Sequence, residues 1–503
     1  MAETTDLRRW LDAGARAVKH ARGRLDAINV FPVPDSDTGT NIYLTLQEGN
    51  RSVAKLGPEA THREVVAAFA RGALMGARGN SGVIVSQYLT AFLSAIDTRG
   101  GLSKVDAKGI ARALDLAADA AYRAVGSPVE GTILTVARAA AKGAADAVVA
   151  KAGKEATAVA AVVAARAALA LTHEQLPSAR AAGVVDAGAA GLVLQLEMLA
   201  ETLAGPQALA ALDEVEWEVE DRVRHAVGVH DHDHSHDDGG AFEVMFVLAS
   251  DEDLRETLTA NLESIGTSVA VTGTHGLWQA HVHTDEPHLA VEHAIAHQAQ
   301  QIFVRNVLMG HEADRGSTGV VALTSCPGMA EPLAEAGAVV LVVPDPTLLK
   351  RRALRRAVKD ASGVAAVVVA GHPALRAAAL ELARKRRKPV LTVLDAQHEA
   401  HVIVAVAAAT LVTPGQDLAT EMADAVAATL VAESSGDALD EDVDRMIDGR
   451  TEIVTLVLAA GVPESVADAV RLSVHGTAPL ADVNVYRGGQ AEPAVLIGVE
   501  RAE

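Results

Sequence analysis

The chain has 503 residues, of which 50% are hydrophobic but only 3% aromatic, and its formal net charge is -21 at pH 7. At about 150 residues per domain this length predicts about three domains, and the alanine-rich composition favours packed helices over an all-β fold. The acidic charge argues against a broad nucleic-acid-binding surface, which would need clustered Lys and Arg. The single cysteine, Cys326, excludes an intrachain disulfide and fits a reducing cytoplasm.

Residues 5–205 show the periodicity of long helices, with apolar residues recurring at positions i, i+3 and i+4. Short glycine-rich loops interrupt the pattern at residues 31–41, 75–82, 125–132 and 181–191. We therefore expect residues 1–205 to form an all-α domain.

Two features argue against stable insertion into a membrane. Residues 1–25 form a charged amphipathic pattern without the apolar run of a signal peptide. The most apolar tract, residues 156–171, is interrupted by Arg166, consists largely of alanine and is too short to span a bilayer. We expect a cytoplasmic protein.

Residues 206–240 are predicted to link the helical domain to the rest of the chain. Their His/Asp-rich stretch, residues 229–240, has neither a periodic pattern nor an apolar anchor, and we expect it to be mobile. Its histidines could also catch metal ions, although solvation of a low-complexity segment is the favoured interpretation.

Two further domains with strands are predicted. Residues 241–315 indicate a small α+β domain, with strands at 242–248 and 277–285 around a helix at 251–266. Residues 316–503 alternate β-branched runs with helical patterns, which predicts parallel strands in an α/β domain. The strands expected in this last domain are residues 320–325, 339–344, 365–371, 389–394, 452–459 and 495–500.

The loop at residues 31–41 carries the strongest chemical signal. Asp35 and Asp37 stand two residues apart, so their carboxylates can converge on one point, and such hard oxygen ligands suit Mg²⁺. Residues 38–41 then open a helix, whose N-terminus can bind phosphate. The alternative is a turn with a helix cap, because Asp, Ser, Thr and Asn are the usual capping residues.

The loop at residues 76–82 adds a second potential anion site. Gly79 and Gly82 permit close approach of a ligand to the backbone, Ser81 offers a hydroxyl, and a helix follows. Two such loops and a carboxylate pair in one domain indicate a nucleoside triphosphate site. The sequence contains neither GxxxxGK[ST] nor GxGxxG, so this site is neither a P-loop nor a dinucleotide fold.

Four stretches together resemble the signature loops of a kinase family. NVFPVPDSDTGTN, ARGNSGVIVSQ, PVEGTILTV and GVVDAGAAGL look like the four loops of the nucleotide-binding L-domain of dihydroxyacetone kinase. Their order and the phrase NVFPVPD are more similar to the ATP-binding subunit of bacterial fatty acid kinase. This resemblance implies an antiparallel barrel of eight helices that binds ATP at one mouth, with two Mg²⁺ ions at the phosphates.

Carried over to this chain, the resemblance implies roles for residues in all four loops. Asp35 and Asp37 are expected to be catalytic metal ligands, with Asn29 as a third polar ligand. The residues expected to bind the nucleotide are Thr38, Gly39, Asn41, Gly79, Asn80, Ser81, Gly82, Thr132 and Asp186. The commoner family motif has Gly where Ser36 stands, so this turn has less backbone freedom here.

A second metal site is suggested in the middle domain. His281 and His283 lie two apart on a predicted strand, so both rings project from one face and could bind Zn²⁺. Alternatively, the two histidines are solvated on a polar face. The HVHT stretch resembles an element of the fatty acid kinase proteins, in which a cysteine on an earlier strand is the third ligand. In this chain Glu243 stands at the position that matches this cysteine.

The leading hypothesis is phosphoryl transfer from ATP to the carboxylate of a fatty acid, giving an acyl phosphate. By resemblance, a separate DegV-like fatty-acid-binding protein presents the acceptor, and the kinase forms a homodimer. An ionised carboxylate needs no general base, and the four loops contain no histidine. The alternatives are a dihydroxyacetone (glycerone) kinase and a regulatory protein that senses nucleotide without turnover.

Two basic clusters, residues 350–359 and 383–389, stand out in the C-terminal region of this acidic chain. Solvated helix faces are the default interpretation, and a docking surface for an acidic partner or weak attraction to anionic lipid is the alternative. We expect the partner protein to dock on the C-terminal domain.

Overall fold

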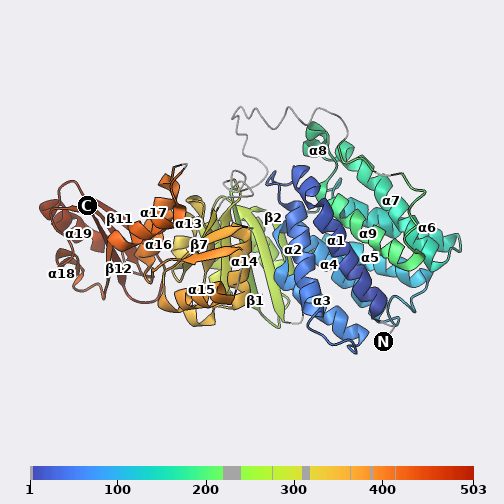
Figure 1. The fold of residues 1–503 in the computed structure, drawn as a ribbon, viewed down its shortest axis with the longest axis horizontal. Coiled ribbons are helices and arrows are strands. Elements are labelled where there is room, and N and C mark those ends of the chain that lie inside the picture. Colours follow the sequence, from blue (N-terminus) through green and yellow to red (C-terminus); the bar gives the residue numbers. More distant parts are fainter. Residues whose placement is uncertain are drawn as a thin grey trace. The chain divides into compact units, whose positions relative to one another are not determined.

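The structure is a computed structural model that describes residues 4–213, 215–218, 240–274, 276–308, 318–362, 364–385, 389–413 and 415–502. The predicted mobile stretch of residues 229–240 lies outside these ranges except for Gly240. Figure 1 shows the helices and strands coloured along the sequence from blue at the N-terminus to red at the C-terminus. By its contacts the chain divides into two compact units. Unit 1 comprises Met1–Gly239 and Ala249–Val282, and unit 2 comprises Gly240–Leu248 and His283–Glu503.

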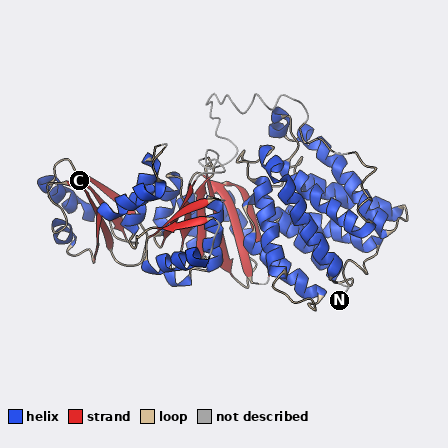
Figure 2. Ribbon diagram, viewed as in Figure 1, coloured by secondary structure: helices blue, strands red, loops and turns tan. Residues whose placement is uncertain are grey.

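The N-terminal part of unit 1 is helical throughout its described residues (Figure 2). Its helices are α1 (Thr5–Ala27), α2 (Thr38–Val53), α3 (His62–Gly76), α4 (Gly79–Asp97), α5 (Ala107–Arg123), α6 (Ile133–Val149), α7 (Lys154–Gln175), α8 (Pro177–Ala182) and α9 (Ala187–Ala204). The all-α prediction is confirmed, with eight long helices and the six-residue α8 between α7 and α9.

The long helices pack as a closed ring. Each contacts the next along the chain, and α9 contacts α1, so the first and last helices of the domain meet. Small residues make the close approach possible: a Cβ added at Gly143 on α6 would lie 2.5 Å from the Cβ of Ala164 on α7. Alanine and glycine thus form tight helix contacts in a domain with few aromatic side chains.

Two of these helices, α7 and α9, are long and apolar enough to cross a membrane by length and composition. The expectation that the tract around Arg166 is too short was therefore wrong, because α7 extends to 22 residues. Both helices are members of the ring: α7 packs against α6 and α9, and α9 packs against α1. Core helices of soluble proteins have the same character, so this is weak evidence for a membrane span.

Unit 1 also contains α11 (Arg255–Glu263), β2 (Thr267–Thr274) and all but the end of β3 (Leu277–Thr284). The helix and β3 were predicted, but α11 is shorter than expected because Asp253 Oδ1 accepts a hydrogen bond from the Arg255 amide in the preceding turn, at 3.1 Å. Strand β2 was not predicted, although the alternation in TSVAVT was a usable signal.

Unit 2 contains the remaining strands and helices. Its strands are β1 (Phe242–Ala249), β4 (Gln301–Asn306), β5 (Thr318–Thr324), β6 (Val339–Val342), β7 (Ala365–Ala370), β8 (Val390–Val393), β9 (Thr429–Ser434), β10 (Thr451–Leu458), β11 (Asp482–Arg487) and β12 (Val495–Arg501). Its helices are α12 (Pro287–Ala296), α13 (Ala330–Glu335), α14 (Arg351–Ala361), α15 (Pro373–Lys385), α16 (Glu399–Leu411), α17 (Leu418–Ala428), α18 (Leu439–Asp444) and α19 (Val466–Thr477).

The strands form an eight-stranded sheet in the order β2-β3-β1-β4-β6-β5-β7-β8 and a four-stranded sheet in the order β11-β10-β12-β9. Strand β5 pairs in parallel with β6 and β7, and β7 pairs in parallel with β8. These pairings confirm the parallel α/β prediction, and all six strands expected after residue 316 are present. Strands β4, β9 and β11 were not predicted.

The four-stranded sheet has a hydrophobic core of its own. Alternate residues of β10 and β12, such as Val454, Leu456 and Ile497, pack against Val470 and Val474 of α19. Strand β12 pairs antiparallel with β10 and β9. The period-two alternation of these strands therefore matches one buried face.

Candidate functional site

The first loop holds its metal-ligand candidates through Asn29. Asn29 Nδ2 donates to Val33 O at 2.8 Å and to Asp35 Oδ1 at 3.1 Å. Asp37 is the N-cap residue of α2, and its Oδ1 accepts from Asn41 Nδ2 at 2.7 Å. Asn29 is 3% exposed. The loop thus places both carboxylates at the N-terminus of α2, each beside a buried amide side chain.

The first and second loops meet through their hydroxyl groups. Thr38 Oγ1 donates a hydrogen bond to Asn29 Oδ1 and lies 3.4 Å from Ser81 Oγ. Thr38 is the first residue of α2, and Ser81 stands in the first turn of α4. The N-termini of these helices therefore meet, and both direct unpaired backbone N–H groups toward the same place.

Two glycines allow this close approach. Gly79 has φ +54°, and an added Cβ would lie 2.4 Å from Asn41 Nδ2. At Gly82 an added Cβ would lie 2.5 Å from Thr45 Oγ1. The residue types predicted from the sequence thus have a geometric reason: any side chain here would separate α4 from α2.

Sequence reasoning missed Asp26, which anchors the start of α2. Its Oδ1 accepts from the Thr40 amide at 2.8 Å, and its Oδ2 accepts from Thr40 Oγ1 at 2.9 Å. Burial raises the pKa of Asp26, while the hydrogen bonds from Thr40 oppose this shift. Gly39 of α2 lies against α1, since an added Cβ would be 2.6 Å from Arg22 O.

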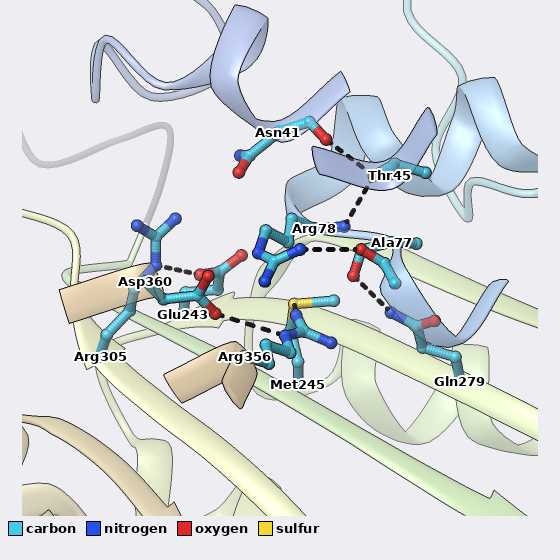
Figure 3. A network of polar contacts seen from close by, with 11 residues as sticks. Asn41, Thr45, Ala77, Arg78, Glu243, Met245, Gln279, Arg305, Arg356 and Asp360 are labelled. Carbon is cyan, nitrogen blue, oxygen red and sulfur yellow. Dashed lines mark hydrogen bonds and ion pairs between the residues drawn. The ribbon is translucent and has the colours of Figure 1, made fainter. Parts of the chain in front are cut away.

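A network of polar contacts holds the second loop in place where it enters α4 (Figure 3). Thr45 Oγ1 donates to Asn41 O at 2.7 Å and accepts from the Arg78 amide at 3.3 Å. Gln279 Nε2 on β3 donates to Ala77 O at 3.1 Å, and Gln279 is 1% exposed. The two residues immediately before α4, Ala77 and Arg78, are therefore held by buried hydrogen bonds.

A cavity of about 270 Å³ opens beside these loops. It is lined by Phe31, Pro32, Asn80, Ser81, Ile84, Val125, Ser127, Val129, Thr132, Ile133, Leu134, Asp186, Gly188, Thr267 and Ser268. Asn80, Ser81, Thr132 and Asp186 were predicted nucleotide contacts, and the structure brings them together. Asp35 and Asp37 are not among the lining residues, so the carboxylate pair stands outside this cavity.

Thr132 and Asp186 reach the cavity as N-cap residues. Thr132 caps α6 by accepting from the Leu134 amide at 3.4 Å, and Asp186 caps α9 by accepting from the Ala189 amide at 2.7 Å. Burial raises the pKa of Asp186 to about 6, although its backbone hydrogen bonds oppose the shift. The N-termini of α4, α6 and α9 therefore all line the cavity, and each contributes partial positive charge to its polar wall.

The three residues of the metal site predicted in the middle domain (residues 241–315) also lie close together. Glu243, His281 and His283 are buried, and each offers one ligand atom, with these atoms all within 4.8 Å of one another. The solvated-face alternative for the histidines was wrong, because His281 is 0% and His283 4% exposed. Arg305 Nε donates to Glu243 Oε2, so this carboxylate also takes part in an ion pair. Two imidazoles and one carboxylate could hold a metal ion.

The basic cluster of residues 350–359 is only partly a surface feature. Arg356 is 7% exposed, and its guanidinium lies over the Phe303 ring at 4.5 Å. Its Nη2 contacts Met245 Sδ at 2.7 Å, and its Nε donates to Asp360 at 3.4 Å (Figure 3). The solvated-face interpretation is therefore wrong for Arg356, because the sheet and a neighbouring carboxylate enclose it.

Three family models match the chain. Residues 32–201 match the DAK2 domain, residues 240–313 match the FakA-like middle domain of fatty acid kinases, and residues 426–500 match the FakA-like C-terminal domain. Together these matches cover more than half of the chain.

Similar proteins are found in bacteria. Protein YloV of Bacillus subtilis is 38% identical over 287 residues, which are 55% of this chain and 50% of YloV. An uncharacterized protein of Staphylococcus haemolyticus is 33% identical over 283 residues, or 54% of this chain and 49% of that protein. The chain thus aligns with about half the length of these relatives. With its DAK2 domain and the two domains that follow it, the chain belongs to the FakA-like family of fatty acid kinase proteins.

Proposed function

We propose that this chain transfers the γ-phosphoryl group of ATP to the carboxylate of a fatty acid that a separate lipid-binding protein presents. The supporting observation is the meeting of Thr38 and Ser81 at two helix N-termini, beside the carboxylates of Asp35 and Asp37. A triphosphate needs this combination of positive helix ends and metal ligands. The family membership adds the fatty acid as the acceptor class.

The chain's own residues position the reactants. The amides at the N-termini of α2 and α4 would bind the phosphate oxygens, and Asn29 keeps Asp35 oriented through its 3.1 Å hydrogen bond. Asp35 and Asp37 would hold Mg²⁺, which neutralises charge on the β- and γ-phosphates when bound. Phosphoryl transfer depends mainly on such positioning and charge neutralisation.

The acceptor needs no base if it is a carboxylate. A fatty acid is ionised at pH 7, and its oxygen can attack phosphorus directly to give an acyl phosphate and ADP. The structure adds one observation in favour of an alcohol acceptor, as in a glycerone kinase: Asp186 lines the cavity and its pKa is raised to about 6. A carboxylate with this pKa could accept a proton from a hydroxyl group.

The test is to incubate the protein with ATP, Mg²⁺ and oleate, with and without a lipid-binding protein from the same genome, and to measure acyl phosphate as its hydroxamate. Product that depends on the lipid-binding protein supports the proposal. Product with dihydroxyacetone instead supports the glycerone kinase, and ATP binding without product from either acceptor supports a nucleotide sensor.

The metal assignment has its own matched control. Replacing Asp35 and Asp37 by Ala should reduce transfer by more than about 100-fold, because no carboxylate then holds the metal at the phosphates. Replacing Asp119 and Asp146, exposed carboxylates of the same helical domain, should leave transfer unchanged. Normal turnover in the Asp35/Asp37 variant would exclude these residues as metal ligands.

We also propose that Glu243, His281 and His283 hold Zn²⁺, because imidazole nitrogens and carboxylate oxygens are common zinc ligands. Metal content of the purified protein, measured by mass spectrometry, should fall in His283→Ala and in Glu243→Gln. His288→Ala, which removes a half-exposed histidine of α12, should retain the metal. Equal zinc content in all three variants would contradict the site.

The remaining family expectations stay predictions. They are a DegV-like partner docking on residues 316–503, a homodimer, a cytoplasmic location, two Mg²⁺ ions, and domain limits at residues 205, 240 and 315. Cross-linking of the full chain to the lipid-binding protein, followed by peptide mapping, would locate the docking surface.

A further inference from the structure

The cavity beside the four loops has one wall that the helical domain does not supply. Thirteen of its lining residues come from the loops and helices up to residue 188, but Thr267 and Ser268 belong to β2. Thr267 is exposed and Ser268 half-buried. The lining of the cavity therefore includes two hydroxyl groups from a segment that follows the last helix of the ring by more than sixty residues.

Strand β2 is hydrogen-bonded to the third glycine-rich loop, residues 125–132. The Gly126 amide donates to Val269 O at 3.0 Å, and Val125 and Ala270 form an antiparallel bridge. Ser127 Oγ donates to Glu263 Oε1 at 3.2 Å. An added Cβ at Gly126 would lie 2.1 Å from Glu263 Oε1, so a side chain here would displace the Glu263 carboxylate. Gly126 therefore lies in close contact with Glu263 at the end of α11.

The neighbouring strand β3 is fastened to the second loop. Gln279 donates to Ala77 O through a buried hydrogen bond of 3.1 Å. Two of the four loops that border the cavity, the second and the third, therefore bond to the neighbouring strands β3 and β2. In addition, Ser268 has φ +52°, an uncommon conformation for a residue with a side chain. Such conformations are concentrated at ligand sites, where packing holds them in place.

The residues that line the cavity are of three kinds. Ser81 and Asn80 lie at the N-terminus of α4, where phosphate is expected, and Asn80 Oδ1 is buried without a hydrogen-bond partner among the described residues. Ile84, Val129 and Leu134 supply an apolar surface suited to a nucleobase. Thr267, Ser268 and Ser127 add hydroxyls, which can both donate to and accept from a ribose or a base edge.

We propose that Thr267 and Ser268 contact the nucleoside part of the bound nucleotide, so that the middle segment completes the nucleotide pocket of the helical domain. This inference rests on the proposed function, because it takes a nucleotide as the ligand. It makes β2 part of the binding site, and it makes the affinity for nucleotide depend on the contacts between β2 and the third loop.

The experiment measures binding of MgADP and of magnesium pyrophosphate to the full chain by calorimetry. In Thr267→Ala/Ser268→Gly the affinity for ADP should fall about tenfold, as expected for the loss of one or two hydrogen bonds. The affinity for pyrophosphate should not change, because it lacks the nucleoside. Glycine suits the backbone at position 268, so this variant is expected to fold.

Two further variants make the result decisive. Thr267→Trp should place a bulky ring where the nucleoside is proposed to bind. It should lower the affinity for ADP more than the hydroxyl deletions do, again without changing the affinity for pyrophosphate. Thr257→Ala removes a similar hydroxyl from an exposed position of α11 and should bind ADP as wild type does. An equal loss of affinity for ADP and for pyrophosphate would show that these residues have only a structural role. Wild-type affinity for ADP in both Thr267 variants would also overturn the inference.

Failure of the proposed function gives a different pattern. If the unmodified chain binds neither ADP nor pyrophosphate, the nucleotide site itself is refuted. If it binds both, and Asp35→Ala/Asp37→Ala weakens both, the nucleotide site stands. Unchanged ADP binding in the Thr267 and Ser268 variants would then refute only the contact with β2.

Discussion

Two buried carboxylates, one in each unit, stand in opposite surroundings. Glu399 in unit 2 is 2% exposed and accepts hydrogen bonds from Thr324 Oγ1 at 2.7 Å, from the Ser325 amide at 2.8 Å and from Ser325 Oγ at 2.9 Å. Asp186 in unit 1 caps α9 and borders the cavity. Burial raises the pKa of both groups.

The difference separates a carboxylate that serves the fold from one that borders a site. Glu399 stands at the N-terminus of α16 and joins it to the end of β5, and Gly371 at the end of β7 leaves room for it, since an added Cβ would lie 2.2 Å from Glu399 Cδ. The hydrogen bonds that the Glu399 carboxylate accepts come from groups of the protein itself. For these two carboxylates, bordering open space distinguishes the one placed at a ligand site from the one whose hydrogen bonds serve the fold.

The largest expected effect on stability is at Glu399. In Glu399→Ala the Ser325 amide and hydroxyl and the Thr324 hydroxyl lose their acceptor and a cavity forms, so the free energy of unfolding of unit 2 should fall by about 4 kcal/mol. All 3 tryptophans, Trp10, Trp217 and Trp278, belong to unit 1. Unfolding followed by circular dichroism should have its midpoint at a lower urea concentration than in wild type. The unfolding midpoint measured by tryptophan fluorescence and the affinity for ADP should remain as in wild type. Equal shifts of both transitions would contradict separate roles.

Asp186→Asn should act in the other direction. Because burial raises the pKa of Asp186 from 3.8 to about 6, the folded state binds its proton more tightly than the unfolded chain does. Stability is therefore lost as pH rises from the unfolded pKa to the folded pKa, and stays lower above this window. Asparagine keeps the helix cap without the charge. At pH 7.5 it should raise the free energy of unfolding of unit 1 by up to about 3 kcal/mol.

The tryptophan-detected urea transition measures this effect directly. At pH 4, where Asp186 is largely protonated in the folded chain, the difference between variant and wild type should nearly vanish. A constant difference at both pH values would show that the charge of Asp186 is not its cause.

Local patterns predicted the helices of the N-terminal domain and the four glycine-rich loops between them. The closed arrangement of the eight long helices was implied by the family resemblance and not by these patterns. The residue types in DSDTGTN and ARGNSG indicated one phosphate site, and the structure places Thr38 Oγ1 3.4 Å from Ser81 Oγ. The spacing of His281 and His283 indicated that both rings lie on one face of a strand, and both have a ligand atom within 4.8 Å of Glu243. Helix periodicity, loop composition and the histidine spacing depend on residues close in the sequence, whereas the roles of the site residues stay predictions.

Contacts between distant segments were not predictable in the same way. Asp26 contacts Thr40 through a buried position on α1, and nothing in the local pattern distinguishes it from a surface aspartate. Thr267 and Ser268 line the cavity only because β2 bonds to the third loop, about 140 residues earlier. The close contact of Gly126 with Glu263 likewise joins segments that no local pattern connects.

The smallest expected effect is at Ser36, between the two carboxylates of the first loop. Ser36 has φ +48°, a left-handed conformation that disfavours residues with a Cβ, and the resembling family commonly has Gly at this position. Ser36→Gly removes this cost but adds freedom to the unfolded chain, so the free energy of unfolding should rise by only about 0.5 kcal/mol. The control is Ser264→Gly, where φ is -75° and the same substitution should lower stability. Tryptophan-detected urea unfolding measures both, and a decrease for Ser36→Gly would show that the serine hydroxyl stabilises this turn more than its backbone conformation costs.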